Sequence, residues 1–498
     1  MKKIKTKYWL ILILLLATVL RFYRLGTYPP LNADEAAIGY DAYSILETGK
    51  DEHGDWLPIH FKSFGDYKPG AYFYMVMPLV KLLGLNEWAV RLPSAVFAIL
   101  TIYLVYQLGV LLWRSERLGL IWAVVLAVSP WHLQFSRGGW ESNTALFLMV
   151  LGVWAFFRFR VGGKTGWIYL SGLSFVLSLY TYHSLRVVLP VFLLGLALFN
   201  LTWLWKERKR FIWPILLSAG LLVPLLVSFL GGGASARFAG VGLLSDVGPL
   251  SRVNELLNQH EGKGLPGIRL IHNRYLIYAI AGAEKYFSHF NGRFLFIDGD
   301  DVPRSRLPEM GTMHYFELFF LVLGLVVFLR KKTKYKYLPF LWLLVAPLAS
   351  AMTFQAPSAL RSLPMVIPLT FLVAVGIDRL WDFKWLRGLI LVVYLWGLVY
   401  WQNDYFVHYL KRYPSAWPGG VKEIVEQLKQ SGNTEPVCIS GDWDQPYILA
   451  LFYLQYPPEL IQKEIQLTPP DQFGFSTVER FDRYQFGNCD NFPGKIIQ

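Results

Sequence analysis

Two adjacent carboxylates, Asp34 and Glu35, follow the first apolar segment of the chain. The residues after them, 36–43, are helix-compatible, which places both carboxylates in the first turn of a predicted helix. The positive end of a helix favours the ionised form of a carboxylate. Such a carboxylate could act as a general base or position a cation. An acidic helix start is also common on ordinary protein surfaces, so the pair alone leaves both interpretations open.

Basic residues lie in the same loop and in three short loops between apolar segments. Lys68 precedes a proline, Arg91 opens the next apolar segment, and the short loops contribute Arg137, Arg186 and Arg361. Any one of them could simply extend to lipid headgroups. Several cations facing carboxylates instead indicate a phosphate site beside an acidic site. The short loops also hold Glu141, Asn143 and His183, which we predict on the acceptor side of the site.

The composition indicates what positions these residues. Of 498 residues, 54% are hydrophobic and only 17% are charged. This excludes a soluble globular enzyme, a disordered chain and a small disulfide-rich scaffold, and it favours a polytopic membrane protein. We therefore predict an all-α fold with eleven membrane spans, at residues 8–23, 89–113, 118–135, 144–157, 166–180, 187–205, 211–230, 313–329, 337–353, 362–380 and 386–401.

The net charge of +13 is concentrated in alternate connections between these spans, at residues 2–7, 113–117, 158–164, 206–210, 330–336 and 382–387. Basic loops on one side of a membrane mark the cytoplasmic side. We therefore predict a multi-pass plasma-membrane protein with a cytoplasmic N-terminus and an exterior C-terminus. The charge pattern also argues against nucleic acid as a partner. The exterior loops are then 24–88, 136–143, 181–186, 231–312, 354–361 and 402–498.

This topology predicts a transmembrane domain at 1–401, with large exterior loops at 24–88 and 231–312, and a small exterior α/β domain at 402–498. In the latter, 436–440 is typical of a strand and 446–456 of a helix. Cys438 and Cys489 both fall in this domain. An oxidising exterior favours a disulfide, with two free thiols as the alternative. In the first exterior loop, His53, Asp55 and His60 could bind a metal ion. The alternative is that these residues are simply solvated, as such residues in a polar loop usually are.

The order of these motifs resembles a known family. Asp34-Glu35, Lys68-Pro69 and Arg91-Leu92-Pro93 follow one another, and Arg137 and Glu141 come in the next exterior loop. The set is similar to the GT-C fold glycosyltransferases that use polyprenyl-phosphate sugars, specifically the protein O-mannosyltransferase and aminoarabinose-transferase-like group. The resemblance covers about residues 8–400. It departs at Glu141, because the family usually has Asp at the position of Ser142, and at Gly70, where the family has proline or an apolar residue.

The resemblance implies that Asp34 is the catalytic base, that Glu35 supports its helix and the acceptor pocket, and that Lys68 holds the lipid phosphate. Arg91, Arg137, Arg186 and Arg361 are candidates for the same anion. The expected reaction is an inverting transfer of mannose or a similar hexose to an exterior hydroxyl of a protein, lipid or polysaccharide. The expected partners are membrane lipid and the lipid-linked donor. No cofactor is required, and the use of a divalent metal and the oligomeric state stay open. The alternatives are a transporter or flippase of lipid-linked material and a non-catalytic cell-envelope scaffold.

Overall fold

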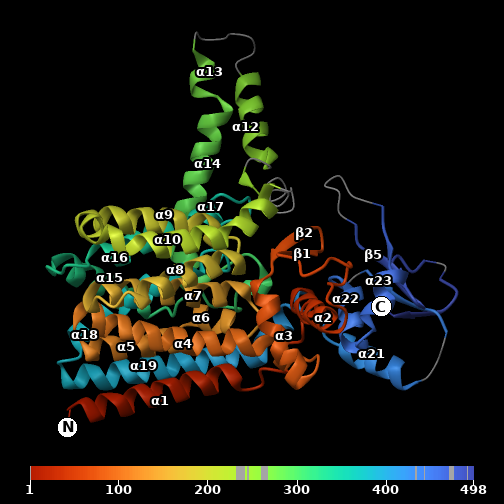
Figure 1. The fold of residues 1–498 in the computed structure, drawn as a ribbon, viewed down its shortest axis with the longest axis horizontal. Helices are drawn as coiled ribbons and strands as arrows, with labels where there is room; N and C mark the ends of the chain where they lie inside the picture. Colours follow the sequence, from red (N-terminus) through yellow and green to blue (C-terminus); the bar gives the residue numbers. More distant parts are fainter. Residues whose placement is uncertain are drawn as a thin grey trace.

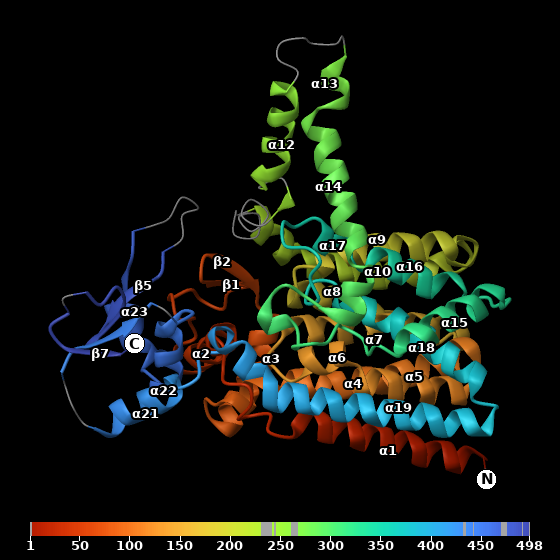
Figure 2. The ribbon, with the colours of Figure 1, turned by 180° about the vertical axis from the view of Figure 1, so that it is seen from behind.

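The computed structural model describes residues 2–230, 242–243, 246–259, 267–431, 435–441, 443–469, 476–490 and 492–497. Long helices run side by side in one part of the molecule, and shorter helices and strands gather at one end of them (Figure 1). A helical hairpin projects from the side of the bundle, and Figure 2 shows the same arrangement from behind. The protein is therefore a helical bundle with a mixed α/β region at one end.

Each of the eleven segments predicted as spans is helical over most of its length, because continuous apolar sequence satisfies its backbone within a helix. The helices of the bundle are α1 (Lys2–Phe22), α4 (Glu87–Trp113), α5 (Glu116–Val128), α6 (Pro130–Ser136), α7 (Glu141–Gly162), α8 (Gly166–Thr181), α9 (Leu185–Phe199), α10 (Leu201–Leu230), α15 (Glu317–Arg330), α16 (Tyr337–Val345), α17 (Leu348–Ala351), η4 (Leu363–Met365), α18 (Val366–Leu380) and α19 (Lys384–Asn403).

Among the described residues, five helices are long and apolar enough to cross a membrane: Glu87–Trp113, Glu141–Gly162, Leu201–Ser228, Leu363–Leu380 and Lys384–Arg412. The pair α5 and α6, bent by 60°, would make a sixth. Four further apolar helices are shorter, at Ala71–Leu83, Gly166–Thr181, Leu185–Phe199 and Tyr337–Ala351. The structure thus contains several helices that are able to span a membrane, and the number of eleven spans stays a prediction.

One predicted connection is wrong. Residues 206–210 were expected to link two spans, but they lie inside α10. Lys, Arg and Glu are good helix formers, so this charged run continues the helix. The interruption between the two helices, α9 and α10, lies earlier, at Asn200. The side-chain amide of Asn200 donates to the carbonyl oxygen of Leu196 (2.6 Å) and to the hydroxyl of Tyr337 (2.7 Å).

The first large loop folds into α2 (Ala33–Thr48), a hairpin of β1 (His60–Ser63) and β2 (Asp66–Pro69), and α3 (Ala71–Leu83). The two strands are antiparallel, and Phe61 pairs with Lys68. The turn between them contains Gly65 at φ 78°, a left-handed conformation that suits glycine. The hairpin therefore fixes where the Lys68 side chain starts.

The C-terminal part contains a five-stranded sheet in the order β4-β5-β6-β3-β7, in which β3 runs parallel to β6 and β7. The predicted strand and helix are confirmed as β3 and α22. A disulfide joins Cys438 to Cys489, so the free-thiol alternative is wrong. The elements are η5 (Asp404–His408), α20 (Tyr409–Arg412), η6 (Pro414–Ala416), α21 (Val421–Gln430), β3 (Val437–Ser440), α22 (Pro446–Leu454), α23 (Pro458–Glu464), β4 (Gln466–Leu467), β5 (Val478–Phe481), β6 (Tyr484–Gly487) and β7 (Lys495–Ile497).

The C-terminal part packs against α2 through α22. One hydrophobic cluster contains Ile38 and Val90 together with Ile448 and Phe452. A Cβ added at Gly39 would lie 2.5 Å from the Phe452 ring, so α2 and α22 approach closely there. The cluster therefore holds α2 in place from the side opposite the bundle.

The projecting hairpin lies in the predicted exterior loop 231–312. It consists of α12 (Val247–Asn258), α13 (Ile268–Ile271) and α14 (Arg274–Ser288), followed by η2 (Arg293–Ile297) and η3 (Pro303–Ser305). Residues 231–241, 244–245 and 260–266 of this loop lie outside the described residues.

Candidate functional site

Helix α2 begins with a capping box that sets the two carboxylates. The Asn32 side chain accepts from the Glu35 backbone N–H (3.0 Å), and the Glu35 carboxylate accepts from the Asn32 backbone N–H (3.3 Å). Two backbone N–H groups at the helix start are thereby satisfied. Asp34 and Glu35 thus lie in the first turn of a helix, as the sequence predicts. Their surroundings differ, since Glu35 is buried and the Asp34 side chain is 37% exposed.

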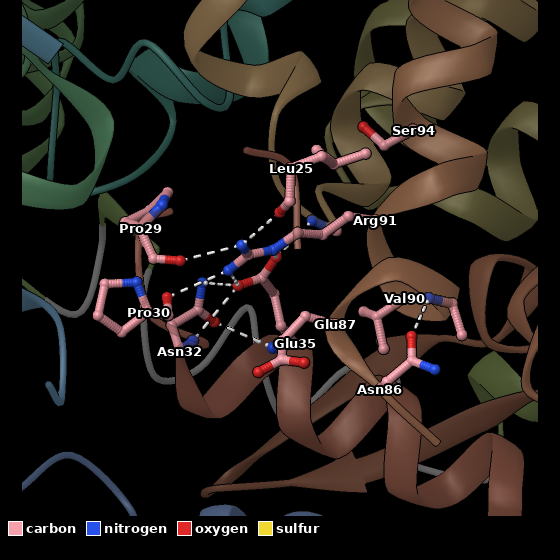
Figure 3. Close-up of polar contacts among 12 residues, drawn as sticks. Leu25, Pro29, Pro30, Asn32, Glu35, Asn86, Glu87, Val90, Arg91 and Ser94 are labelled. Carbon is pink, nitrogen blue, oxygen red and sulfur yellow. Dashed lines mark hydrogen bonds and ion pairs between the residues drawn. The ribbon is translucent and has the colours of Figure 1, made fainter. Parts of the chain in front are cut away.

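Glu35 forms a buried, two-pronged ion pair with Arg91 (Figure 3). Arg91 Nε and Nη2 each donate to a carboxylate oxygen of Glu35 at 2.7 Å. The other N–H groups of Arg91 reach the backbone carbonyl oxygens of Leu25, Pro29 and Pro30, at 2.9–3.1 Å. Arg91 is fully buried, and all five of its N–H groups have a protein acceptor. The pair therefore fastens α2 to α4 and the chain before it, and the structure does not support Arg91 as an anion ligand or Glu35 as a proton acceptor.

Lys68, on β2, contacts Asp34 in the first turn of α2. The Lys68 ammonium forms an ion pair with Asp34 Oδ1. It also lies over the ring of Phe64, 5.1 Å from the centroid, and Phe64 packs edge-on against Tyr447 of α22. The Lys68 side chain is 12% exposed, which leaves the pair accessible mainly from the Asp34 side. The structure thus brings together a partly exposed carboxylate and a cation from separate segments.

Arg186 is held near the Lys68 hairpin by two histidines. It donates to His60 Nε2 at 2.8 Å and to His183 Nδ1 at 3.1 Å. Because a guanidinium can only donate, both facing ring nitrogens carry lone pairs. His183 Nε2–H then donates to the carbonyl oxygen of Tyr67 (2.7 Å), next to Lys68, and His60 Nδ1–H donates to Ser228 Oγ (2.7 Å). Burial and the Arg186 charge lower the pKa of His60 to about 4, which keeps this ring neutral at pH 7.

The remaining predicted cations do not join Lys68. Arg137 is buried, donates to the carbonyl oxygens of Arg21 (3.2 Å) and Tyr23 (2.7 Å), and packs over the Tyr405 ring. Arg361 donates to Thr353 Oγ1 and to the carbonyl oxygen of Gln355, within its own loop. The prediction of one cluster of arginines around an anion is therefore wrong. Backbone carbonyl oxygens accept hydrogen bonds from both of these arginines.

The three residues predicted on the acceptor side, Glu141, Asn143 and His183, lie in different surroundings. Gly139, in the loop before Glu141, donates its backbone N–H to Glu35 Oε1 at 2.8 Å, which brings this loop against the start of α2. Asn143 is buried and donates to the carbonyl oxygen of Ser94 at 2.8 Å, a packing contact of α7 with α4. His183 belongs to the Arg186 network. Glu141 lies two residues after Gly139, at the first residue of α7, and so follows directly on the segment that contacts α2.

The metal alternative is wrong for the residues that suggested it. His53 Nε2 lies 3.3 Å from Glu52, whereas His60 contacts Arg186 and Ser228. Asp55 is exposed. Within the described ranges, no three His, Cys, Asp or Glu side chains are grouped so that they could hold a metal ion.

A buried pair of acids, Asp41 and Glu52, lies near Lys68 and was not predicted from the sequence. Asp41, two turns after Asp34 on α2, accepts from the Glu52 backbone N–H at 2.9 Å, and Tyr447 donates to the Glu52 carboxylate at 3.2 Å. Among the described residues, one carboxylate oxygen of each acid, Asp41 Oδ2 and Glu52 Oε2, has no hydrogen-bond partner. Burial raises the pKa of Asp41, and burial with the nearby charge of Asp51 raises the pKa of Glu52 to about 8. The seven-residue spacing from Asp34 to Asp41 was the signal for a shared helix face.

Glu52→Gln is expected to flatten the dependence of stability on pH. A carboxyl whose pKa is raised in the folded state stabilises the fold below its ordinary pKa near 4.5, and this stabilisation is lost as pH rises through about 8. The Gln variant should therefore melt close to wild type at about pH 4.5 and lose less stability than wild type as the pH rises from about 4.5 to about 8. Thermal unfolding at several pH values measures this. Glu47→Gln, at an exposed position on α2, is the control, and equal slopes for Glu52→Gln and wild type would contradict the prediction.

Part of the chain is similar in sequence to known transferases. Residues 67–228 match the sequence family described as dolichyl-phosphate-mannose-protein mannosyltransferase. Over 182 residues the chain is 30% identical to the undecaprenyl phosphate-alpha-4-amino-4-deoxy-L-arabinose arabinosyl transferase of Pseudomonas aeruginosa. The resemblance predicted from the sequence is confirmed. The matched family segment includes Lys68, Arg91, Arg137, Glu141 and Arg186, whereas Asp34 precedes it.

The arabinosyl transferase match spans 34% of this chain and 31% of the relative, so the chain aligns with about a third of the length of the curated relatives that it matches. The fold likeness is wider. ArnT from Cupriavidus metallidurans, solved bound to undecaprenyl phosphate, superposes with a TM-score of 0.56 at 14% identity, over 90% of this chain and 85% of that one. Its structure in the apo state gives the same score. The bundle therefore has a GT-C fold, and the chain is a multi-pass membrane protein.

Proposed function

We propose that this protein is an integral membrane glycosyltransferase that moves a sugar from a polyprenyl-phosphate donor to an acceptor hydroxyl, with inversion at the anomeric carbon. The observation that carries the proposal is the ion pair of Asp34 and Lys68 at one end of a GT-C bundle. The relatives named above act on, or are bound to, lipid phosphates of this kind. The pair offers one group for each half of the reaction.

In the proposed mechanism, the donor phosphate takes the place of Asp34 at the Lys68 ammonium. The freed Asp34 carboxylate accepts the proton of the acceptor hydroxyl as its oxygen bonds to the anomeric carbon. The bond between that carbon and the phosphate oxygen breaks, and polyprenyl phosphate leaves with its electrons. Lys68 stabilises the charge that develops on this leaving group. The mechanism uses no cofactor, because Lys68 supplies the positive charge.

An apolar cavity supports a lipid-linked donor. It has a volume of about 450 Å³ and lies between α7, α8, α9 and α10, lined by side chains such as Phe175, Leu179, Leu193 and Leu222. The carbonyl oxygen of Leu179 accepts from Arg186 Nε at 3.1 Å. The polar network around Arg186 thus connects the end of the cavity to the strand of Lys68. We propose that the isoprenoid chain of the donor lies in this cavity.

The identity of the sugar, the acceptor and the orientation in the membrane are also proposals. The sugar is mannose, or a similar hexose, or the aminoarabinose named for the relatives, and the acceptor is a protein, lipid or polysaccharide. The basic connections favour a cytoplasmic N-terminus in the plasma membrane, with the site and an α/β domain at 402–498 on the exterior. Glu141 is proposed on the acceptor side because its loop abuts α2 through Gly139.

Lys68→Met is expected to weaken the binding of undecaprenyl phosphate by about 10- to 100-fold, because a charge-assisted contact contributes about 1.5–3 kcal/mol. Affinity for undecaprenol, which lacks the phosphate, should change little. Binding to the purified protein in detergent measures both. Lys62→Met, on the paired strand of the same hairpin, is the matched control. Equal affinity of wild type and Lys68→Met for undecaprenyl phosphate would remove Lys68 from the donor site.

A further inference from the structure

The hairpin of α12 and α14 has an unusual direction. In both views it points out of the bundle, across the direction of the long helices (Figures 1 and 2). Since membrane-spanning helices run roughly along the membrane normal, a segment that crosses their direction extends along the membrane plane. The hairpin is therefore oriented to lie along the bilayer.

The outward face of α14 is apolar. Its exposed positions recur at the helical spacing of four and carry Tyr275, Leu276, Ile280 and Phe287, with alanines between them. Tyr275 is 72% exposed and Phe287 is 67% exposed. Two charged residues are exposed on this helix: Glu284, and Arg274 at its start, which lies over the Tyr275 ring. An amphipathic helix on a water-exposed surface would instead turn its polar side outward.

The opposite face of α14 is fixed by polar contacts, so this orientation is specific. Lys285 forms an ion pair with Asp246 (3.2 Å) and donates to the carbonyl oxygen of Phe354 (2.9 Å). Tyr278 donates to the carbonyl oxygen of Asp246 at 2.9 Å, and Tyr286 donates to that of Leu344 at 2.7 Å. Lys285, Tyr278 and Tyr286 are thus turned toward the protein, and the large exposed side chains of α14 are mostly apolar.

The companion helix α12 has the reverse arrangement. Val253 is buried, and Val247 and Leu250 are exposed in the first turn, while the rest of the helix exposes polar side chains: Ser251, Arg252, Asn254, Glu255 and Asn258. One helix of the hairpin therefore presents a mostly polar surface and the other a mostly apolar surface. This two-sided character is typical of a segment at a boundary between water and lipid.

A helix of the bundle that precedes the hairpin also presents an exposed apolar surface. Helix α10, which immediately precedes the hairpin in the chain, is long and apolar enough to cross a membrane, yet only 11% of its most apolar stretch is buried. Val227 is 63% exposed and Leu230 is 88% exposed at the end nearest the hairpin. We propose that the hairpin lies in the membrane interface, with the apolar face of α14 against lipid acyl chains and α12 toward water. The partner of this surface is the bilayer.

Spin labels on introduced cysteines test the proposal in the full-length protein. Both native cysteines are bonded to each other, so a single new thiol is labelled selectively. Labels at Tyr275→Cys, Ile280→Cys and Phe287→Cys report on α14, and labels at Ser251→Cys and Glu255→Cys are the matched controls on α12. The protein is reconstituted in vesicles of phosphatidylethanolamine and phosphatidylglycerol. Collision with oxygen, which partitions into lipid, is compared with collision with a water-soluble nickel chelate.

The ratio of oxygen to nickel collision is expected to be several-fold higher on α14 than on α12. Equal ratios on the two helices would overturn the proposal, because both would then face water. Labels on α14 that neither reagent reaches would also overturn it, because a protein surface, such as a second copy of the chain, would then cover the helix. These outcomes do not depend on glycosyl transfer.

Discussion

Replacing Asp34 by Asn is expected to abolish sugar transfer while the protein still folds. The variant keeps the size of the side chain and loses the carboxylate that accepts the acceptor proton. General base catalysis contributes about 10²- to 10⁴-fold to a rate, so turnover should fall by at least about 100-fold. The fold should persist, because the Asp34 side chain is 37% exposed and the buried support of α2 comes from Glu35. Release of polyprenyl phosphate from a labelled donor measures turnover, and gel filtration in detergent checks folding.

Asp55→Asn is the matched control for this experiment. Asp55 belongs to the same loop, is exposed, and receives no role in the proposed mechanism. Its variant should keep wild-type turnover. If Asp34→Asn also retained wild-type turnover, Asp34 would not be the base, and the proposed mechanism would be rejected.

Arg91→Ala is expected to prevent stable folding. Glu35 would then be a buried carboxylate without its cation, and breaking a buried ion pair from one side costs about 3–5 kcal/mol. That loss is a large part of the stability of a typical domain. The carbonyl oxygens of Leu25, Pro29 and Pro30 would lose their donors as well. Arg91→Lys should also destabilise strongly, since an ammonium cannot make the same forked contacts. Thermal unfolding and the yield of monodisperse protein measure both variants.

An exposed ion pair provides the comparison for Arg91. Arg293 pairs with Asp298, and the side chain of Arg293 is 75% exposed. Exposed pairs contribute about 0–1 kcal/mol, so Arg293→Ala should unfold close to wild type. If Arg91→Ala matched Arg293→Ala in stability, the contacts around Arg91 would not be the support that the structure indicates.

The helical fold was predictable, because apolar segments flanked by charge leave the backbone few alternatives. The start of α2 was predictable as well, since a polar residue precedes the two acids and a helix-compatible stretch follows. The error at α10 has a simple cause. A short charged run is compatible with both a loop and a helix, and the neighbouring helices decide between them.

The roles of the arginines could not be predicted from the sequence. Arg91 and Arg137 stand at the ends of apolar segments, where a phosphate ligand and a buried structural residue look the same. Their partners are mostly backbone carbonyl oxygens of residues 20–30, and the sequence carries no sign of where irregular backbone will lie. Asp41 and Glu52 were missed for a related reason, because only the fold shows that the loop around Glu52 returns to α2.

The fate of a labelled donor tests the central claim most directly. Purified wild-type protein is reconstituted in vesicles that contain polyprenyl-phosphate sugars labelled in the sugar, with mannose and aminoarabinose donors in separate samples and candidate acceptors added. We predict that at least one donor loses its label to an acceptor and leaves polyprenyl phosphate behind. Donors that stay intact with every sugar and acceptor tested, or that only move between leaflets unchanged, would contradict the proposal and favour a scaffold or a lipid transporter, respectively.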